Sequence, residues 1–156
     1  MERRASFNFD HPDSLDQETL VRQVTRLSHG EPVDCPVCDF ATHTRSKVVE
    51  HIEPARYILL EGLLALHFEE LRSFYQLKVY VETPDPVCLE RQMARDTRER
   101  GRTVESVSQQ YEATVRPMAQ AYAWPQRAFA DLVVSGTQHL QDSVDAVYAG
   151  VAAVSD

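Results

Sequence analysis

Five arginines lie within twelve residues of this otherwise acidic chain. Arg91, Arg95 and Arg98 follow helical spacing and therefore share one helix face, and Gly101 lets the chain turn and bring Arg102 back toward them. Arginine suits phosphate groups because the planar guanidinium donates paired hydrogen bonds to neighbouring oxygens. Acidic residues are interleaved with the arginines, so a solvated helix with internal ion pairs is the competing interpretation.

Glu61 stands near the end of residues 57–62, a run that is almost continuously apolar. Such a run predicts a strand buried on both faces of a parallel sheet. Ligands of open α/β sheets bind beyond the carboxyl ends of the strands, where a carboxylate can hold a metal ion or a water molecule. A polar residue that merely ends the strand is the alternative, and position alone does not separate the two.

Two loops carry polar clusters, one with Asp10, His11 and Asp13 and the other with Asp39 and His43. An ionised aspartate only accepts hydrogen bonds, so it suits the vicinal hydroxyls of a sugar. Ordinary turn chemistry is the competing interpretation, because aspartate and asparagine are common in turns.

Cys35 and Cys38 form a C-x-x-C pair, a spacing found in zinc and redox sites. A structural zinc site normally needs a second pair, and Cys88 stands far away in a predicted helix. A redox pair belongs at the start of a helix, whereas this pair lies in a proline-flanked strand. A small metal-binding or redox protein is therefore the least favoured function for this chain.

The chain has 156 residues, of which 43% are hydrophobic, and its formal net charge is −8. That length predicts one domain spanning residues 1–156. The acidic balance argues against non-specific binding of nucleic acid, and no apolar run is long enough for a membrane helix. The amino terminus has no apolar signal region and the three cysteines cannot all pair, so a cytoplasmic location is expected.

Strands alternate with helices along the chain, which is typical of a parallel α/β sheet. Prolines set two short strand-like runs apart as a hairpin outside the main sheet. The predicted strands are residues 33–37 and 48–52 for the hairpin, and 57–62, 77–82 and 131–134 for the sheet. The first helix is predicted to be capped by Asp13 or Ser14 and to end before Gly30. The other predicted helices are 63–71, 84–100, 104–121 and 142–154, with Tyr111 and Trp124 as packing residues.

Several motifs follow one another in a specific order. They are FNFDHPD at 7–13, PVCDF at 36–40 followed by HTR at 43–45, ILLEG at 58–62, RDTRERGR at 95–102, QY at 110–111, VRP at 115–117 and AD at 130–131. In this order they resemble the motifs of the uridine–cytidine kinases, and the resemblance covers nearly the whole chain. It implies a P-loop kinase fold, with a parallel sheet, flanking helices and a small β-hairpin that binds the nucleoside.

The resemblance also implies a reaction, the transfer of the γ-phosphate of ATP or GTP to the 5′-hydroxyl of a nucleoside in pyrimidine salvage. Asp10 would bind the ribose hydroxyls, Phe40 and His43 would contact the pyrimidine, and Gln110 would line the nucleoside pocket. The expected partner is accordingly a small-molecule nucleoside, with no nucleic acid and no membrane, and a homo-oligomer is expected as well.

The same resemblance implies residues for the phosphates and the metal. Arg95, Arg100 and Arg102 would close as a lid over the phosphates of the nucleotide and over the substrate, which Arg102 would contact. Glu61 would help to hold Mg²⁺.

The sequence departs from the family at several positions. The P-loop motif G-x-x-x-x-G-K-[ST], which holds the β- and γ-phosphates, occurs nowhere in the chain, and the catalytic aspartate would lie upstream of Met1. At two substrate-binding positions Cys38 replaces a tyrosine and Gln92 replaces an arginine. Residues 135–137 replace a Pro-Arg-Gly turn. Relaxed or altered specificity is therefore expected.

The P-loop strand of this family stands between the strands at 57–62 and 77–82, and its absence leaves two strand edges unpaired. We therefore expect residues 1–156 to be the remainder of a longer kinase, incomplete or inactive as an isolated chain, or in need of a partner. The alternative is a non-catalytic nucleoside- or nucleotide-binding pseudokinase, or a subunit that completes another P-loop chain.

Overall fold

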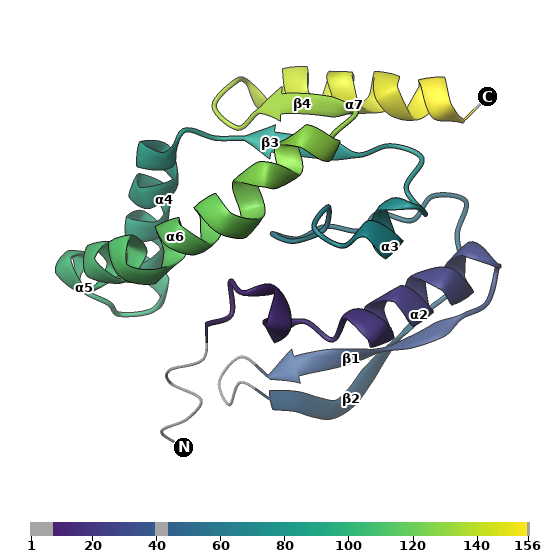
Figure 1. The fold of residues 1–156 in the computed structure, drawn as a ribbon, viewed down its shortest axis with the longest axis horizontal. Coiled ribbons are helices and arrows are strands. Elements are labelled where there is room, and N and C mark those ends of the chain that lie inside the picture. The colour runs from purple at the N-terminus through teal and green to yellow at the C-terminus, as the bar shows by residue number, and fades with distance from the viewer. Residues whose placement is uncertain (1–7, 40–43, 156) are drawn as a thin grey trace. The chain divides into compact units, whose positions relative to one another are not determined.

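The computed structural model describes residues 8–39 and 44–155 of the chain (Figure 1). The chain divides into two compact units, Met1–Phe74 and Tyr75–Asp156, and each is described by itself. The single domain predicted over residues 1–156 stays a prediction.

The first unit contains a long helix, a hairpin and a short helix. Its elements are a 3₁₀ turn at Pro12–Ser14, α2 at Gln17–Ser28, β1 at Val33–Asp39, β2 at Thr44–Ile52 and α3 at Glu69–Arg72. Asp16 caps α2, because its carboxylate accepts the backbone N–H of Thr19 at 3.0 Å. The prediction that Asp13 or Ser14 caps this helix is wrong, since both lie in the 3₁₀ turn that precedes it. The helix ends before Gly30, as predicted, where the chain turns with a φ of 77°.

The predicted hairpin is confirmed, and its strands are longer than expected. β1 and β2 pair antiparallel, with a register shift between Pro36 and Cys38. Proline has no N–H to donate to the ladder, so the irregularity falls beside it. Helix α2 is tied to β1 by Gln23, whose side-chain amide donates a hydrogen bond of 2.8 Å to the carbonyl of Asp34.

Residues 57–62 do not form the predicted strand, and 57–61 have no regular secondary structure. Their apolar side chains are exposed: Leu59 by 91%, Tyr57 by 58% and Ile58 by 47%. No strand among the described residues pairs with this run, and an extended segment leaves its backbone groups unpaired without a neighbouring strand. The prediction is wrong for that reason, because the apolar pattern alone does not supply a hydrogen-bonded neighbour.

The predicted helix at 63–71 is wrong over most of its length, since only Glu69–Arg72 is helical. The residues before it form turns, which Arg72 closes by donating to the carbonyls of Leu66 and His67 at 2.8 and 2.7 Å. These turns still supply much of the core of the unit, whose buried apolar residues are Leu27, Val33, Leu64, Leu66, Phe68 and Leu71.

The second unit contains a parallel sheet and the longer helices. Its elements are β3 at Val79–Glu82, α4 at Asp85–Glu99, α5 at Val104–Gln110, α6 at Arg116–Met118, β4 at Leu132–Ser135 and α7 at Leu140–Val154. Around α6 lie two π-helical turns, Tyr111–Val115 and Ala119–Ala123, and a 3₁₀ turn follows at Trp124–Phe129. This helical segment is longer than the predicted 104–121. Its hydrogen-bond pattern changes around Pro117 and Pro125, which have no N–H to donate.

Strands β3 and β4 pair in parallel along their whole length. This pairing confirms the predicted α/β fold, in which helices flank a parallel sheet and the hairpin is separate. The backbone N–H of Lys78 donates to the Asp131 carboxylate at 2.8 Å, and the Lys78 ammonium lies 2.8 Å from the same carboxylate. Helix α7 runs beside β4 (Figure 1). The carboxyl ends of the two strands, at Glu82 and Ser135, therefore lie side by side.

The hairpin carries a histidine between two carboxylates. His51 lies 2.8 Å from Asp34 through Nδ1 and 3.2 Å from Glu53 through Nε2, and these hydrogen bonds, that to Asp34 first, raise the pKa of His51. Because the folded pKa is the higher one, this interaction stabilises the hairpin fully below the unfolded pKa. The contribution is lost as the pH rises through the folded pKa.

We expect Asp34→Asn to lower the pKa of His51 toward that of a free histidine, because the amide cannot pair with an imidazolium charge. An NMR titration of the His51 ring in both proteins measures this pKa. Glu31→Gln, which removes a carboxylate paired with Arg26 instead, is the control and should leave the titration unchanged. Equal pKa values in the wild type and Asp34→Asn would contradict the expectation.

Candidate functional site

The turn between α4 and α5 gathers the arginines of the predicted lid. Gly101 has a φ of 61°, a left-handed conformation that reverses the chain after α4. Thr103 then caps the start of α5. The reversal returns Arg102 to α4, where its backbone N–H donates to the carbonyl of Asp96 at 3.2 Å.

Asp96 lies at the centre of this turn with only 1% of its surface exposed. Its carboxylate accepts a hydrogen bond of 2.8 Å from Arg95, and the guanidinium groups of Arg100 and Arg102 lie 3.3 and 3.4 Å from it. One carboxylate thus brings together the three arginines that the family resemblance places in a lid. Asp96 was not among the residues predicted from the sequence. The signal that could have identified it is an acidic residue among arginines, shortly before the glycine that ends the helix.

Arg91 and Arg98 do not join this cluster, although helical spacing placed them on one face with Arg95. Arg91 donates to the carbonyl of Gly136 at 2.8 Å, and Arg98 is exposed and pairs with its neighbour Glu99. Helical spacing therefore predicted the wrong set, because the turn after α4 brings residues from beyond the helix onto the cluster.

Gln110 adjoins the cluster, since the guanidinium of Arg102 donates to its side-chain oxygen. The same guanidinium donates to the carbonyl and hydroxyl of Ser106 at 3.2 and 3.1 Å, so Arg102 links the turn to α5. Gln92 is partly buried on α4, four residues before Asp96. Three predicted substrate-binding residues, Gln92, Arg102 and Gln110, therefore belong to this α4–α5 region.

Asp10 lies in the turn before α2, where its backbone N–H donates to Asn8 Oδ1 at 3.0 Å. Partial burial raises the pKa of the Asp10 carboxyl. No described residue donates a hydrogen bond to that carboxylate. A partly buried acceptor without a donor fits a ligand that brings hydroxyl groups.

The other predicted residues of the first unit are less completely placed. Glu61 is exposed in the irregular run after the hairpin, so the prediction that it ends a strand is wrong. Phe40 and His43 lie outside the described residues. Cys38 is on β1, opposite Arg45 of β2. Asp10 and Glu61 belong to the first unit, and the arginine cluster belongs to the second.

Within residues 8–39 and 44–155, no group of three or more His, Cys, Asp or Glu side chains could hold a metal ion. Mg²⁺ commonly binds through one or two carboxylates together with substrate phosphates, so a single exposed Glu61 fits that manner of binding. The Cys35 thiol donates to Gln23 Oε1 at 3.6 Å, and burial raises its pKa.

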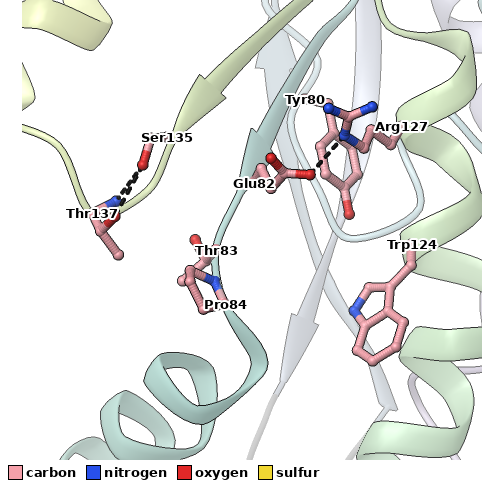
Figure 2. Close-up of a pocket in the computed structure, with 8 residues that line it drawn as sticks. All are labelled: Tyr80, Glu82, Thr83, Pro84, Trp124, Arg127, Ser135 and Thr137. Atoms are coloured by element: carbon pink, nitrogen blue, oxygen red, sulfur yellow. Dashed lines mark hydrogen bonds and ion pairs between the residues drawn. The ribbon is translucent and has the colours of Figure 1, made fainter.

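A pocket of about 480 Å³ opens at the carboxyl ends of β3 and β4 (Figure 2). It is lined by Tyr80, Glu82, Thr83, Pro84, Trp124, Arg127, Ser135 and Thr137. Ligands of parallel sheets bind at this edge. Trp124, predicted to be a packing residue, is 43% exposed and faces the pocket, so that prediction is wrong. The sequence analysis did not identify this pocket, since its residues come from three distant segments.

Gly136 lies close to Thr83 in the loop that borders the pocket. A Cβ atom added to Gly136 would lie 2.0 Å from the hydroxyl of Thr83, so no other residue fits without a shift. On the other side, Arg127 donates to the Glu82 carboxylate at 2.6 Å (Figure 2). Gly136, in the segment 135–137, therefore packs closely against Thr83, the residue that follows β3.

Asp85, at the start of α4, holds the helical segment that follows α5. Tyr111 donates to its carboxylate at 2.6 Å, and Arg116 lies 2.7 Å from it. The pKa of Asp85 is lowered, mainly by the hydrogen bond from Tyr111. The pKa of Tyr111 is raised, first by burial and then by its hydrogen bond to Asp85. Tyr111 is 3% exposed, which confirms its predicted packing role. Asp85 and Asp96, which lie near the two ends of α4, therefore both hold α4 to residues that follow it in the chain.

Residues 1–141 match the family model described as "Phosphoribulokinase / Uridine kinase family". The chain belongs to this family. The uridine kinase of Pasteurella multocida (strain Pm70) is 44% identical over 134 residues, which are 86% of this chain and 62% of that protein. The uridine kinase of Lactobacillus johnsonii (strain CNCM I-12250 / La1 / NCC 533) is 46% identical over 134 residues, 86% of this chain and 64% of that protein. The uridine kinase of Chloroflexus aurantiacus (strain ATCC 29366 / DSM 635 / J-10-fl) is 42% identical over 153 residues, 98% of this chain and 73% of that protein.

The predicted resemblance to the uridine–cytidine kinases is thereby confirmed. The chain spans less than two thirds of the length of several of these relatives, 62% and 64% in the first two cases above. The FNFDHPD motif at 7–13 and the arginine cluster both fall within the residues matched to the phosphoribulokinase/uridine kinase family. In the described part of the chain, no helix combines the length and the apolar character needed to cross a membrane.

We expect Tyr111→Phe to lower the free energy of unfolding by about 1.5 kcal/mol, because the Asp85 carboxylate loses a charge-assisted hydrogen bond. The pKa of Asp85 is lowered in the folded protein, so this stabilisation is present above the unfolded pKa. It disappears as the pH falls through the folded pKa. Urea unfolding at neutral pH and at acid pH measures both effects.

Tyr148→Phe is the control, because the Tyr148 side chain on α7 is 77% exposed. It should leave the unfolding free energy unchanged at both pH values. A Tyr111→Phe variant as stable as this control at neutral pH would show that Asp85 does not hold the segment.

Proposed function

We propose that this chain carries the nucleoside-binding and lid parts of a uridine-kinase-type phosphotransferase, which moves the γ-phosphate of ATP or GTP to the 5′-hydroxyl of a pyrimidine nucleoside. The observation that carries the proposal is the cluster of Arg95, Arg100 and Arg102 around the buried Asp96, in a chain of this family. Phosphoryl transfer depends mainly on positioning the phosphates and neutralising their charge, which is what converging guanidinium groups do.

The arginines keep donors for a ligand after binding Asp96. The side chains of Arg95 and Arg100 are 46% and 57% exposed, and Arg95 uses only its Nε for the carboxylate. Guanidinium donors on one side of a cluster suit adjacent phosphate oxygens. In this proposal the three arginines draw the phosphates of the nucleotide toward α4 and exclude water from them.

The nucleoside is held mainly by the first unit in this proposal. The Asp10 carboxylate accepts hydrogen bonds from the ribose hydroxyls, and Phe40 and His43 contact the pyrimidine. For the second unit, the proposal assigns substrate contacts to Gln110 and Arg102, which meet in the α4–α5 region. Partial burial of Asp10 supports its role, because a hydroxyl ligand then supplies donors that the described residues do not.

Mg²⁺ would be held by Glu61 together with the phosphates of ATP, and it would supply charge neutralisation at the transferred group. Cys38 and Gln92 replace larger or charged groups at substrate positions, so we propose a less selective nucleoside site. The P-loop motif does not occur among these 156 residues, so the proposal assigns them only the nucleoside-binding and lid parts of the reaction.

A non-catalytic nucleotide-binding module is the second candidate. The observation that favours it is the lack of a P-loop lysine motif within these residues. Such a module would bind ADP and a nucleoside through the same side chains, without transferring phosphate.

Transfer of labelled γ-phosphate from ATP to uridine, measured together with calorimetric binding of ADP, separates these candidates. Label in uridine monophosphate supports the kinase, and binding without transfer supports the module. A chain that binds neither ADP nor uridine contradicts both.

We expect Arg102→Ala to weaken ADP binding by about tenfold or more, because a charge-assisted contact is removed. Arg98→Ala is the matched control: it removes an equal charge near the end of α4, but Arg98 is 76% exposed and pairs only with Glu99. Equal losses in the two variants would indicate general charge attraction and not a site.

We expect Asp10→Ala to weaken uridine binding by about tenfold, because the ribose hydroxyls lose their acceptor. In the wild type, affinity should fall as the pH drops through the pKa of Asp10, which lies above that of an ordinary aspartate. Calorimetry across acid pH measures both effects. Asp13→Ala, whose side chain is 87% exposed, is the control and should bind uridine normally.

A further inference from the structure

The Asp96 carboxylate is buried although it is charged. Burying an unpaired carboxylate is strongly unfavourable, so such a group is found only where cations and hydrogen bonds surround it. Here three guanidinium groups do so, and each of them is more exposed than the carboxylate, at 46%, 57% and 28% for Arg95, Arg100 and Arg102 against 1%. The carboxylate therefore lies inside the cluster and the arginines lie around it.

The side chain of Asp96 contacts all three arginines, and its backbone carbonyl contacts two of them. Oδ1 faces Arg95 and Arg100, and Oδ2 faces Arg102. The Asp96 carbonyl accepts the backbone N–H groups of Arg100 and Arg102, at 3.2 Å each. One residue thus determines where the chain of the turn runs and where its guanidinium groups point.

The cluster as a whole carries a net positive charge. Three guanidinium groups and one carboxylate leave two positive charges in a chain whose net charge is −8. An anion with several spaced oxygens, such as the polyphosphate of a nucleotide, matches several fixed guanidinium groups better than a single phosphate does.

We infer that Asp96 is a positioning residue, which holds Arg95, Arg100 and Arg102 in the arrangement that receives a polyphosphate chain. The inference rests on the proposed function. Holding the arginines in place before the ligand arrives removes the entropy loss that flexible side chains otherwise suffer on binding.

The positioning role and simple electrostatics predict opposite effects of Asp96→Asn on the affinity for an anion. Asp96→Asn removes a negative charge beside three arginines, so charge alone predicts tighter binding of an anion. Loss of positioning predicts weaker binding, because asparagine has an NH₂ donor in place of one carboxylate oxygen and can no longer accept from the guanidinium groups on both sides.

The probes are inorganic tripolyphosphate and inorganic phosphate, with affinities measured by calorimetry on the full chain at low ionic strength. In Asp96→Asn we expect the ratio of tripolyphosphate affinity to phosphate affinity to fall by about tenfold, the loss of one multidentate contact. Glu99→Gln is the matched control, since it removes an equal charge from the same helix, and Glu99 pairs with Arg98 and with none of the three arginines of the cluster. Its ratio should equal that of the wild type.

A second measurement avoids dependence on how Asp96→Asn folds. In the wild type, the Arg95 Nε–H that donates to Asp96 should give a slowly exchanging NMR signal that persists when tripolyphosphate is added, whereas Arg98 should exchange rapidly. This readout reports the arrangement of the cluster and not the stability of the chain.

Unchanged or tighter tripolyphosphate binding by Asp96→Asn, relative to Glu99→Gln, would overturn the inference and leave the proposed function standing. Rapid exchange at Arg95 in the wild type would overturn it as well. If the wild type protects the Arg95 signal but binds no tripolyphosphate, Asp96 still positions the arginines. In that case the proposed phosphate site is contradicted, and with it the claim that the arginines receive a polyphosphate.

Discussion

A buried carboxylate constrains everything within hydrogen-bond reach, because leaving it unpaired is far less favourable than any local rearrangement. Asp96 imposes this constraint on the α4–α5 turn, where its side chain and its carbonyl both face arginines. Gly101 makes the turn sterically possible, and Asp96 decides which residues it brings together. The candidate phosphate site is therefore a consequence of satisfying one internal charge.

A second carboxylate, Asp85, holds neighbouring residues in the same way at the other end of α4. Asp85 accepts a hydrogen bond from Tyr111 and pairs with Arg116, so the helical segment after α5 returns to the start of α4. With contacts near both of its ends, α4 serves as a rigid support for the lid turn. A phosphate site on such a support needs little reorganisation when charge develops on a transferred group.

Sequence patterns predicted local structure well where the element satisfies itself. Helices α2, α4 and α7 and the β1–β2 hairpin carry their hydrogen-bond partners within a short stretch of chain. The run at 57–61 has an equally clear strand pattern, but a strand depends on a distant neighbour, and no described strand pairs with it. The pocket beside Gly136 escaped prediction for the same reason, since Thr83 and Trp124 meet it from remote segments.

The sequence by itself determined the family, the order of the elements and the arginine-rich turn, because motifs and periodicities are local and survive without a fold. Only the tertiary structure decided which arginines act together. Helical spacing selected Arg91, Arg95 and Arg98, whereas the folded turn selects Arg95, Arg100 and Arg102. A buried charge pairs with the groups that lie near it in the folded chain, and Arg102 comes near Asp96 only after the chain has reversed at Gly101.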